Sequence, residues 1–225
     1  METIKPYVVF TVGGLAITDT VVFTWVIMAL IVGLAALLGR RRPAMLELLL
    51  DFLNDAISDV MGRPATPYLP FLGTLAIFIA ASNTFSAVPY ITAPTRDVST
   101  PLALALVVFF SVHYFGIREK GLWQYLKDMA TPIFTLPLEI IGQLSRTLAL
   151  TLRLFGNIVS GEMVVAVLFA LAPLFVPIPM AGFGLFTGIL QAYIFTSLAA
   201  VYIAASIEAS EPPLVRKSKP QGVKE

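Results

Sequence analysis

The chain contains no cysteine, a single histidine and few charged residues. The missing cysteines exclude disulfides, thiolate metal ligands and a cysteine nucleophile, and one histidine excludes a multi-histidine metal centre. Charged residues make up 13% of the 225 residues, against about 25% in soluble domains. The net charge is +1, which argues against a nucleic-acid-binding surface. With 57% hydrophobic residues, the sequence predicts an integral membrane protein.

Charge-free stretches of about 20 residues mark the expected membrane spans. They predict an all-α, polytopic membrane protein that forms one domain over residues 1–225. The expected parts are an external segment (1–17), a span (20–39), an amphipathic surface helix (44–61), spans at 68–90 and 98–117, a tilted helical hairpin (134–170 and 180–207) and a cytoplasmic tail (208–225). A strong positive flank follows the first apolar run rather than preceding it, so we expect this run to be retained and not cleaved as a signal peptide.

The basic residues predict the orientation of the chain. Arg40, Arg41 and Arg42 follow the first span, and basic residues are enriched in cytoplasmic loops. The N-terminus is therefore expected outside. The loop from Arg118 to Asp128 and the C-terminal tail are expected in the cytoplasm.

The segment 44–61 has the pattern of a helix that lies along the membrane surface. Its acidic residues recur every four positions and share one face, at Glu47, Asp51, Asp55 and Asp59. A solvated face is the simplest interpretation of this stripe, and contact with a partner is the alternative.

A second polar stripe runs through the apolar segment 134–170. Glu139, Arg146, Arg153 and Ser160 are spaced by seven residues, which is close to two helical turns, so they share one slowly drifting face. Glu162 follows Arg153 by nine residues and points to the opposite side. A charge at bilayer depth costs about 2.5 to 3.5 kcal/mol on insertion scales, so Arg153 is a candidate functional residue.

The arrangement predicts two separate water-accessible paths with a permanent cation between them. A guanidinium group stays protonated, so it cannot relay a proton, but it can hold a passing carboxylate ionised. The chain has no evident mobile carrier of its own, so we expect that carrier in another subunit. Gly184 and Gly188 permit close helix approach, and Gln191 could project near the Arg153 face if the hairpin helices pack antiparallel.

The motifs around these residues resemble subunit a of F-type ATP synthases over most of the chain. The resemblance rests on Leu144-Ser145-Arg146, Leu152-Arg153-Leu154-Phe155-Gly156-Asn157, Gly161-Glu162 and Leu190-Gln191-Ala192-Tyr193-Ile194-Phe195. Further support comes from Pro94-Thr95-Arg96-Asp97-Val98, from Ser82-Asn83 and from the segment His113 to Lys120.

The resemblance implies the roles of the site residues. Arg153 matches the essential arginine that faces the carboxylate on each c-subunit of the rotor ring. Asn157, Glu162 and Gln191 match the outer half-channel, and Glu139 matches the cytoplasmic half-channel. Asn83 and Ser160 are further candidates for lining the paths. Some relatives pair the glutamate with a histidine or an acidic residue on the next helix, whereas this chain has Gly184 there.

The resemblance also implies a proton-translocating stator subunit in the bacterial inner membrane. Its expected partners are the c-subunit ring, peripheral-stalk b-type subunits, the remaining synthase subunits and the lipid bilayer. We expect no cofactor, no metal, no nucleotide site and no enzyme activity of the chain alone. The rival interpretations are a self-contained ion channel or transporter and a non-conducting scaffold. Sodium remains an alternative to the proton as the coupling ion.

Several residues also have plainer interpretations. Arg153 could be a structural arginine at a helix contact, Glu162 could reach the outer interface, and Glu139 could be an interfacial residue at a helix end. Arg146 fits an interfacial or helix-pairing charge better than a channel residue, and His113 fits an interface residue. Asn83 could serve equally as interhelical glue or as a half-channel lining.

Overall fold

The computed structural model describes residues 8–12, 15–85, 97–130, 136–171 and 177–208. Parts of the expected external segment, of the second span and of the hairpin (1–7, 86–90 and 134–135) lie outside these residues, as do the outer turn at 94–96 and the tail from 209 onward. The structured elements are β1 (Val8–Val12), β2 (Leu15–Thr18), α1 (Asp19–Arg41), α2 (Pro43–Met61), α3 (Leu69–Phe85), α4 (Ser99–Lys120), α5 (Leu122–Ala130), α6 (Leu136–Leu171) and α7 (Pro177–Glu208).

The predicted helices are found close to their expected bounds, because charges and helix-breaking residues mark their ends. Asp19 lies in the first turn of α1, and Arg40 and Arg41 lie in its last turn, where each sign complements the helix dipole. Pro43 begins α2, and Gly62, in the left-handed conformation with φ 67°, follows its last residue.

Four helices of the described residues are long and apolar enough to cross a membrane: α1, α4, α6 and α7. Apolar α3 has only 17 described residues. With 36 residues, α6 is about 54 Å long, which exceeds a hydrocarbon core of about 30 Å.

Two elements differ from the expectation. A short antiparallel hairpin of β1 and β2 precedes α1, with Val8 opposite Thr18 and Val12 opposite Leu15. The cytoplasmic loop expected from 118 to 128 folds instead into the last turn of α4 and helix α5. Gly121, with φ 81°, separates the two helices, and the buried Tyr125 packs against Gly116, where an added Cβ would come within 2.5 Å of the ring.

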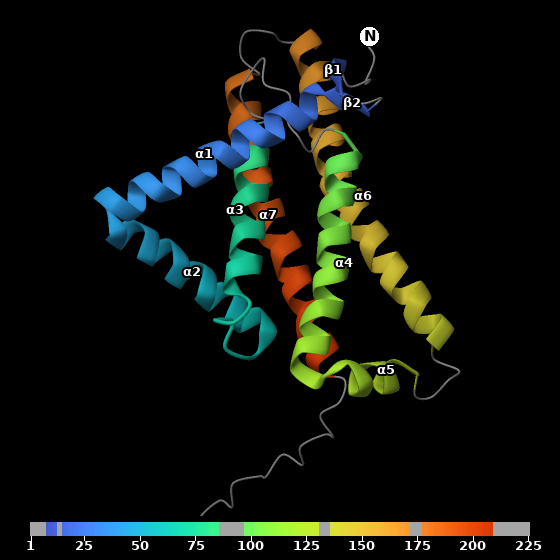
Figure 1. Cartoon of the computed structure of the whole chain (residues 1–225). Helices are drawn as coiled ribbons and strands as arrows, with labels where there is room; N and C mark the ends of the chain where they lie inside the picture. Colours follow the sequence, from blue (N-terminus) through green and yellow to red (C-terminus); the bar gives the residue numbers. More distant parts are fainter. Residues whose placement is uncertain (1–7, 13–14, 86–96, 131–135, 172–176, 209–225) are drawn as a thin grey trace, which may run out of the picture.

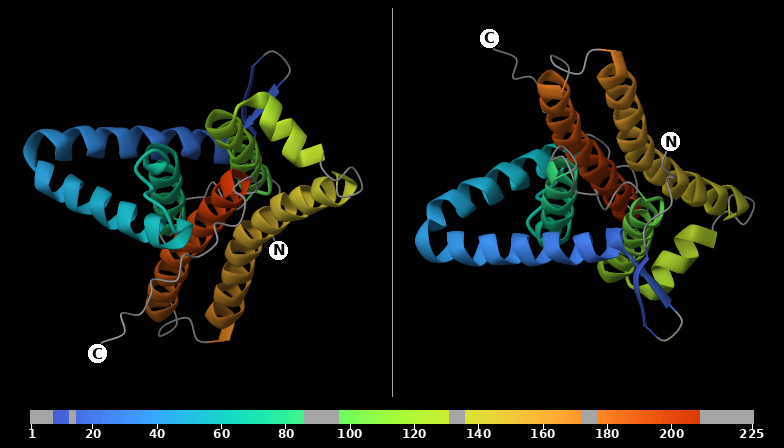
Figure 2. Two further views of the ribbon diagram at one scale, coloured as in Figure 1. Left: turned by 90° about the horizontal axis from the view of Figure 1, so that it is seen from below. Right: turned by 90° about the horizontal axis from the view of Figure 1, so that it is seen from above.

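The helices α3, α4 and α7 form the centre of the molecule, and α6 lies beside α4 and α7 (Figure 1). Small side chains on α7 (Ala192, Ala199 and Ala200) are buried in this core and allow close helix packing. The helices α1 and α2 form a V that projects to one side, away from α6 (Figure 2). The acidic residues of α2 are exposed, and so are several of its apolar residues.

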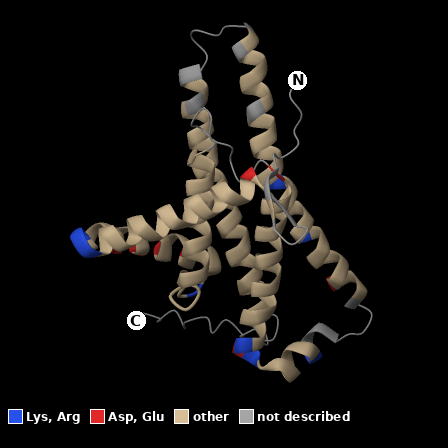
Figure 3. Cartoon of the chain, turned by 45° about the horizontal axis from the view of Figure 1, so that its top comes forward, with Lys and Arg blue, Asp and Glu red and all other residues tan. Residues whose placement is uncertain are grey.

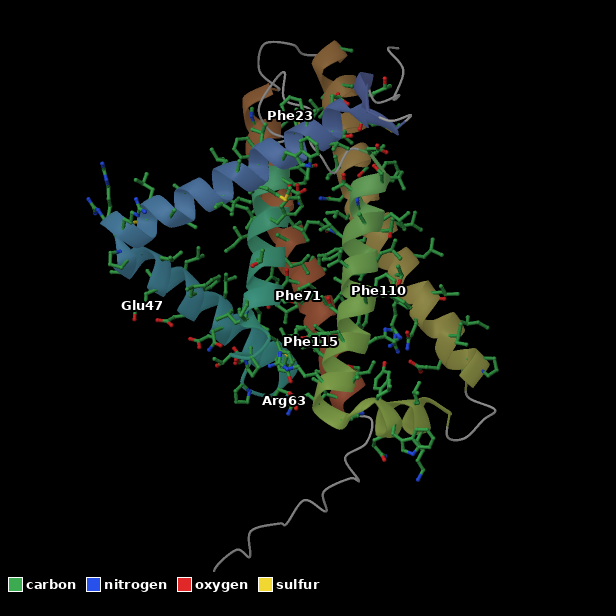
Figure 4. The ribbon with its side chains drawn as sticks, viewed as in Figure 1. Phe23, Glu47, Arg63, Phe71, Phe110 and Phe115 are labelled. Atoms are coloured by element: carbon green, nitrogen blue, oxygen red, sulfur yellow. The ribbon has the colours of Figure 1, made fainter. Side chains whose placement is uncertain are left out.

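One contact ties the base of α3 to the end of α4. The Tyr68 hydroxyl donates a hydrogen bond of 2.8 Å to Glu119, and its ring meets Phe115 edge-on at 5.1 Å. Figure 4 shows Phe71 and Phe115 close together, with Arg63 below them. Burial raises the pKa of Tyr68, and the hydrogen bond to Glu119 raises it further.

We expect Tyr68→Phe to lower the free energy of unfolding by about 1 kcal/mol, because one hydrogen bond is lost. A raised pKa means that the folded chain holds the phenolic proton more tightly than the unfolded chain. The stabilisation is therefore present at neutral pH and is lost as the pH rises above about 10. Thermal unfolding of the detergent-solubilised chain between pH 7 and 11 would measure both effects, and equal alkaline sensitivity of the variant would contradict the assignment.

Candidate functional site

The polar stripe on α6 is largely exposed, although one of its members, Arg146, also contacts α7. Leu150, Leu154 and Ile158 are buried against the neighbouring helices, whereas Arg146, Arg153 and Ser160 are exposed. Asn157 and Glu139 are half-buried at the edges of the stripe. The side chain of Glu162 lies outside the described residues. Figure 3 shows that charged residues gather at the helix ends and along α2, whereas α6 carries isolated charges along its length.

Arg153 is exposed on an apolar helix. None of the side chains that the structure describes forms an ion pair or a hydrogen bond with it. Ala149 and Gly156, one turn away on either side, are exposed, and in the part of the chain that the structure describes no atom lies within 4 Å of a Cβ added at Gly156. The side chains on either side of Arg153 are therefore small enough for another helix to approach closely.

A contact between Arg146 and Tyr202 sets the register of α6 against α7. The Arg146 guanidinium carbon lies 5.3 Å from the centre of the Tyr202 ring, in the range of a cation–π interaction. Eleven residues are about three helical turns, so they return to the same face. Asn157 follows Arg146 by eleven residues, and Gln191 precedes Tyr202 by eleven. In an antiparallel pair, Asn157 and Gln191 therefore lie at one level on facing sides.

Buried polar groups gather where α3 crosses α7. Asn83 is 1% exposed and donates a hydrogen bond of 3.0 Å from Nδ2 to the carbonyl of Gly188. Gln191, one turn further along α7, is 6% exposed, and its Nε2 has no hydrogen-bond partner among the described groups; the same holds for the buried Ser82 hydroxyl. Buried polar groups are normally satisfied by protein or water, so this crossing suits bound water.

The structure thus brings Asn83 and Gln191 together, and helical spacing from the Arg146–Tyr202 contact predicts Asn157 near their level, while Glu139 stands apart at the other end of α6. The Glu139 carboxylate accepts a hydrogen bond of 3.2 Å from Gln143. Burial raises the pKa of Tyr125 on α5, and the negative charge of Glu139 raises it further, which places α5 beside this acidic end. Ser82, Thr196 and Tyr202 were not predicted as site residues. Ser82 could have been predicted as a site residue, because it precedes Asn83 directly in the sequence.

Comparison with known proteins identifies relatives over most of the chain. A family model described as "ATP synthase A chain" matches residues 17–204. The chain is 47% identical to "ATP synthase subunit a 2" of Bradyrhizobium sp. strain BTAi1 over 206 residues, which cover 88% of this chain and 92% of the relative. It is 46% identical to "ATP synthase subunit a 2" of Picosynechococcus sp. strain PCC 7002, over 87% of this chain and 88% of the relative. It is 40% identical to "ATP synthase subunit a" of Albidiferax ferrireducens, over 89% and 91%.

Proposed function

The chain belongs to the ATP synthase subunit a family, and from this premise we propose that Arg153 separates two half-channels through which protons reach and leave a rotating ring of carboxylates. The observation that carries the proposal is the exposed Arg153, which lacks a counter-charge among the described side chains. A transporter in which Arg153 pairs with an internal acid would place that acid beside it. A carboxylate on a neighbouring subunit supplies the counter-charge instead, and the small residues around Arg153 admit its helix.

In this mechanism the arginine acts as a fixed charge. A carboxylate that approaches Arg153 is favoured in its ionised form and releases its proton. The guanidinium itself stays protonated and passes no proton. Its charge also repels a cation that would pass directly between the two paths, so proton flow requires the ring to turn.

The outer path is formed by the polar residues where α3 crosses α7 and by the polar residues of the neighbouring α6. In this proposal Asn83 and Gln191 at the crossing and Asn157 on α6 line one level of the path, and Ser160 and Glu162 are the next polar positions of α6. A proton that enters here neutralises a ring carboxylate, which can then move into lipid. Gly184 in place of a second acid or a histidine leaves Glu162 as the acidic residue of this path.

The cytoplasmic path leaves along the end of α6 that carries Glu139. This assignment places the N-terminus outside and the C-terminus in the cytoplasm, in agreement with the arginines at the end of α1. The c-ring and peripheral-stalk b-type subunits are the proposed neighbours, and residues 1–225 act as one membrane domain. The chain alone performs no catalysis in this proposal, and it couples proton flow to the rotation that drives ATP synthesis.

We expect Gln191→Leu to slow ATP-driven proton pumping by the assembled complex about tenfold or more, because an apolar side chain removes a polar group from the outer path. The matched control is Thr196→Val, which removes another buried, unpartnered polar group from α7, five residues away. Pumping into inverted membrane vesicles, followed with a pH-sensitive dye, would compare the two. Equal rates for both variants would show that the outer path does not pass Gln191.

A further inference from the structure

The short helix α5 carries apolar residues that the described part of the chain covers only in part. Tyr125 is buried against Gly116 of α4, which holds α5 in place. The exposed apolar patch consists of Leu122, Trp123 and Leu126, which are 58%, 84% and 49% exposed. These positions are i, i+1 and i+4, so they adjoin one another on the helix surface. A patch of this kind on a nine-residue helix marks an interaction surface.

The helix α5 lies where the membrane helices end. It follows α4 after Gly121 and lies crosswise to α4 rather than continuing it (Figures 1 and 2). Nine residues rise about 14 Å, which is too short to cross a hydrocarbon core of about 30 Å. Because α4 is long and apolar enough to span the membrane, a helix that crosses its end lies along the membrane surface, where apolar side chains can enter the lipid.

Basic residues stand at both ends of α5. Lys120 is the last residue of α4, and Lys127 is exposed in the last turn of α5. Figure 3 shows the basic residues at the end of α4 and on α5. Residues 118–128 hold three basic and two acidic residues, and one of the acids, Glu119, accepts a hydrogen bond at the base of α3. Lys127 follows Trp123 by four residues, so the charge adjoins the exposed apolar patch.

We propose that α5 is a membrane-surface helix that binds anionic phospholipid of the cytoplasmic leaflet, with its exposed apolar patch at the boundary between acyl chains and headgroups and Lys127 at the lipid phosphates. Tryptophan is enriched at this boundary because its ring is apolar and its N–H is a donor. A lysine reaches the phosphates through its flexible apolar stem. Because α5 packs on both α4 and α6, the bound lipid sets the depth at which the inner ends of these helices lie.

The inference rests on the proposed function only for the side of the membrane, because the cytoplasmic leaflet carries the anionic lipid. Contact between α5 and lipid needs neither Arg153 nor rotation of a ring.

The chain has only two tryptophans, so fluorescence quenching can locate Trp123 in the bilayer. Trp25→Phe leaves Trp123 as the single tryptophan of the full chain, which is reconstituted into liposomes of phosphatidylcholine and phosphatidylglycerol. Trp123→Phe leaves Trp25, 52% exposed on α1, as the matched control. Trp25 lies six residues after Asp19, about 9 Å from the start of α1 and far from the arginines at its other end. Lipids brominated on their acyl chains quench a tryptophan that they touch, and aqueous iodide quenches one that faces water.

We expect lipids brominated close to the headgroup to quench Trp123 most strongly, and iodide to quench it only weakly. At equal mole fraction, brominated phosphatidylglycerol should associate with Trp123 about fivefold better than brominated phosphatidylcholine, the effect expected of one lysine near an anionic surface. Trp25 should show no such preference. Lys127→Gln should remove the preference at Trp123 and leave the depth profile unchanged.

Strong quenching by iodide with none by either lipid would show that α5 projects into water and would overturn the proposal. Equal association of the two lipids with Lys127 present would overturn the preference for anionic lipid. The bromolipid series is repeated on the assembled complex, as the difference between complexes with Trp25→Phe alone and with both tryptophans replaced by phenylalanine. Loss of lipid quenching there would show that another subunit covers the patch, which also overturns the proposal.

These outcomes are separate from those that test the proposed function. The liposomes have the same lipids in both leaflets, so quenching does not depend on the orientation of the chain. A complex that fails the lipid test but loses coupled synthesis with Arg153→Ala would keep the half-channels and lose the lipid site. A complex that passes the lipid test but tolerates loss of Arg153 would do the reverse.

Discussion

Arg153→Ala should abolish ATP synthesis driven by an imposed proton gradient, while passive proton leak through the membrane sector should rise. Two unit charges 4 Å apart interact by about 4 kcal/mol at the effective dielectric near a protein surface. Loss of an interaction of this size would slow release of the proton from the ring carboxylate by about a thousandfold. Removal of the fixed charge also removes the repulsion that separates the two half-channels, so protons can pass without rotation.

The matched control for this prediction is Arg146→Ala, which removes the same charge from the same face of α6, seven residues away. We expect this variant to retain coupled synthesis at a reduced rate, because Arg146 packs on Tyr202 and lies off the level of Asn157 and Gln191. ATP synthesis and dye-reported leak would be measured in the same vesicles. Near-normal synthesis by Arg153→Ala, or equal failure of both variants, would contradict the role assigned to Arg153.

Much of the helical architecture could be predicted, because membrane helices depend on local sequence. An apolar run inside a membrane must satisfy its backbone hydrogen bonds within itself, which favours a helix. The composition of the chain was therefore enough to predict α1, α4, α6 and α7. The exposed face of α6 followed in the same way from the seven-residue spacing of Glu139, Arg146, Arg153 and Ser160. Periodicity assigns residues to a face whether or not the partner is known.

The missed features depend on contacts between distant segments. The segment of α5 is short and mixed in composition, and it packs where the ring of Tyr125 meets Gly116 and Ser206. The position of Asn157 relative to Gln191 depends on the register between α6 and α7, which the contact between Arg146 and Tyr202 indicates. The small-residue pattern at Gly184 and Gly188 did predict close approach, but it could not tell which helix approaches. The structure shows α3 at Gly188, whereas none of the described residues approaches Gly184.

We therefore expect Gly188→Ala to destabilise the chain and Gly184→Ala to leave it unchanged or slightly stabilised. A Cβ at position 188 would lie 2.8 Å from the Cβ of Asn83 and 3.5 Å from its carbonyl carbon. The new methyl group therefore forces α3 and α7 apart and stretches the hydrogen bond from Asn83 to the Gly188 carbonyl. Overpacking of this kind typically costs about 1 to 3 kcal/mol.

The control separates packing from helix propensity. Alanine is the better helix former by about 1 kcal/mol at both positions, and no atom of the described residues lies within 4 Å of a Cβ added at Gly184. Packing therefore makes Gly188→Ala lower the stability of the chain, whereas Gly184→Ala leaves it unchanged or raises it, although the chemical change is the same. Thermal unfolding of the solubilised chain would measure the difference, and equal midpoints would show that α3 does not press on α7 at Gly188. Because Gln191 lies one turn from Gly188, the destabilised variant should also lose proton pumping while Gly184→Ala retains it, which ties the packing of α3 on α7 to the outer path.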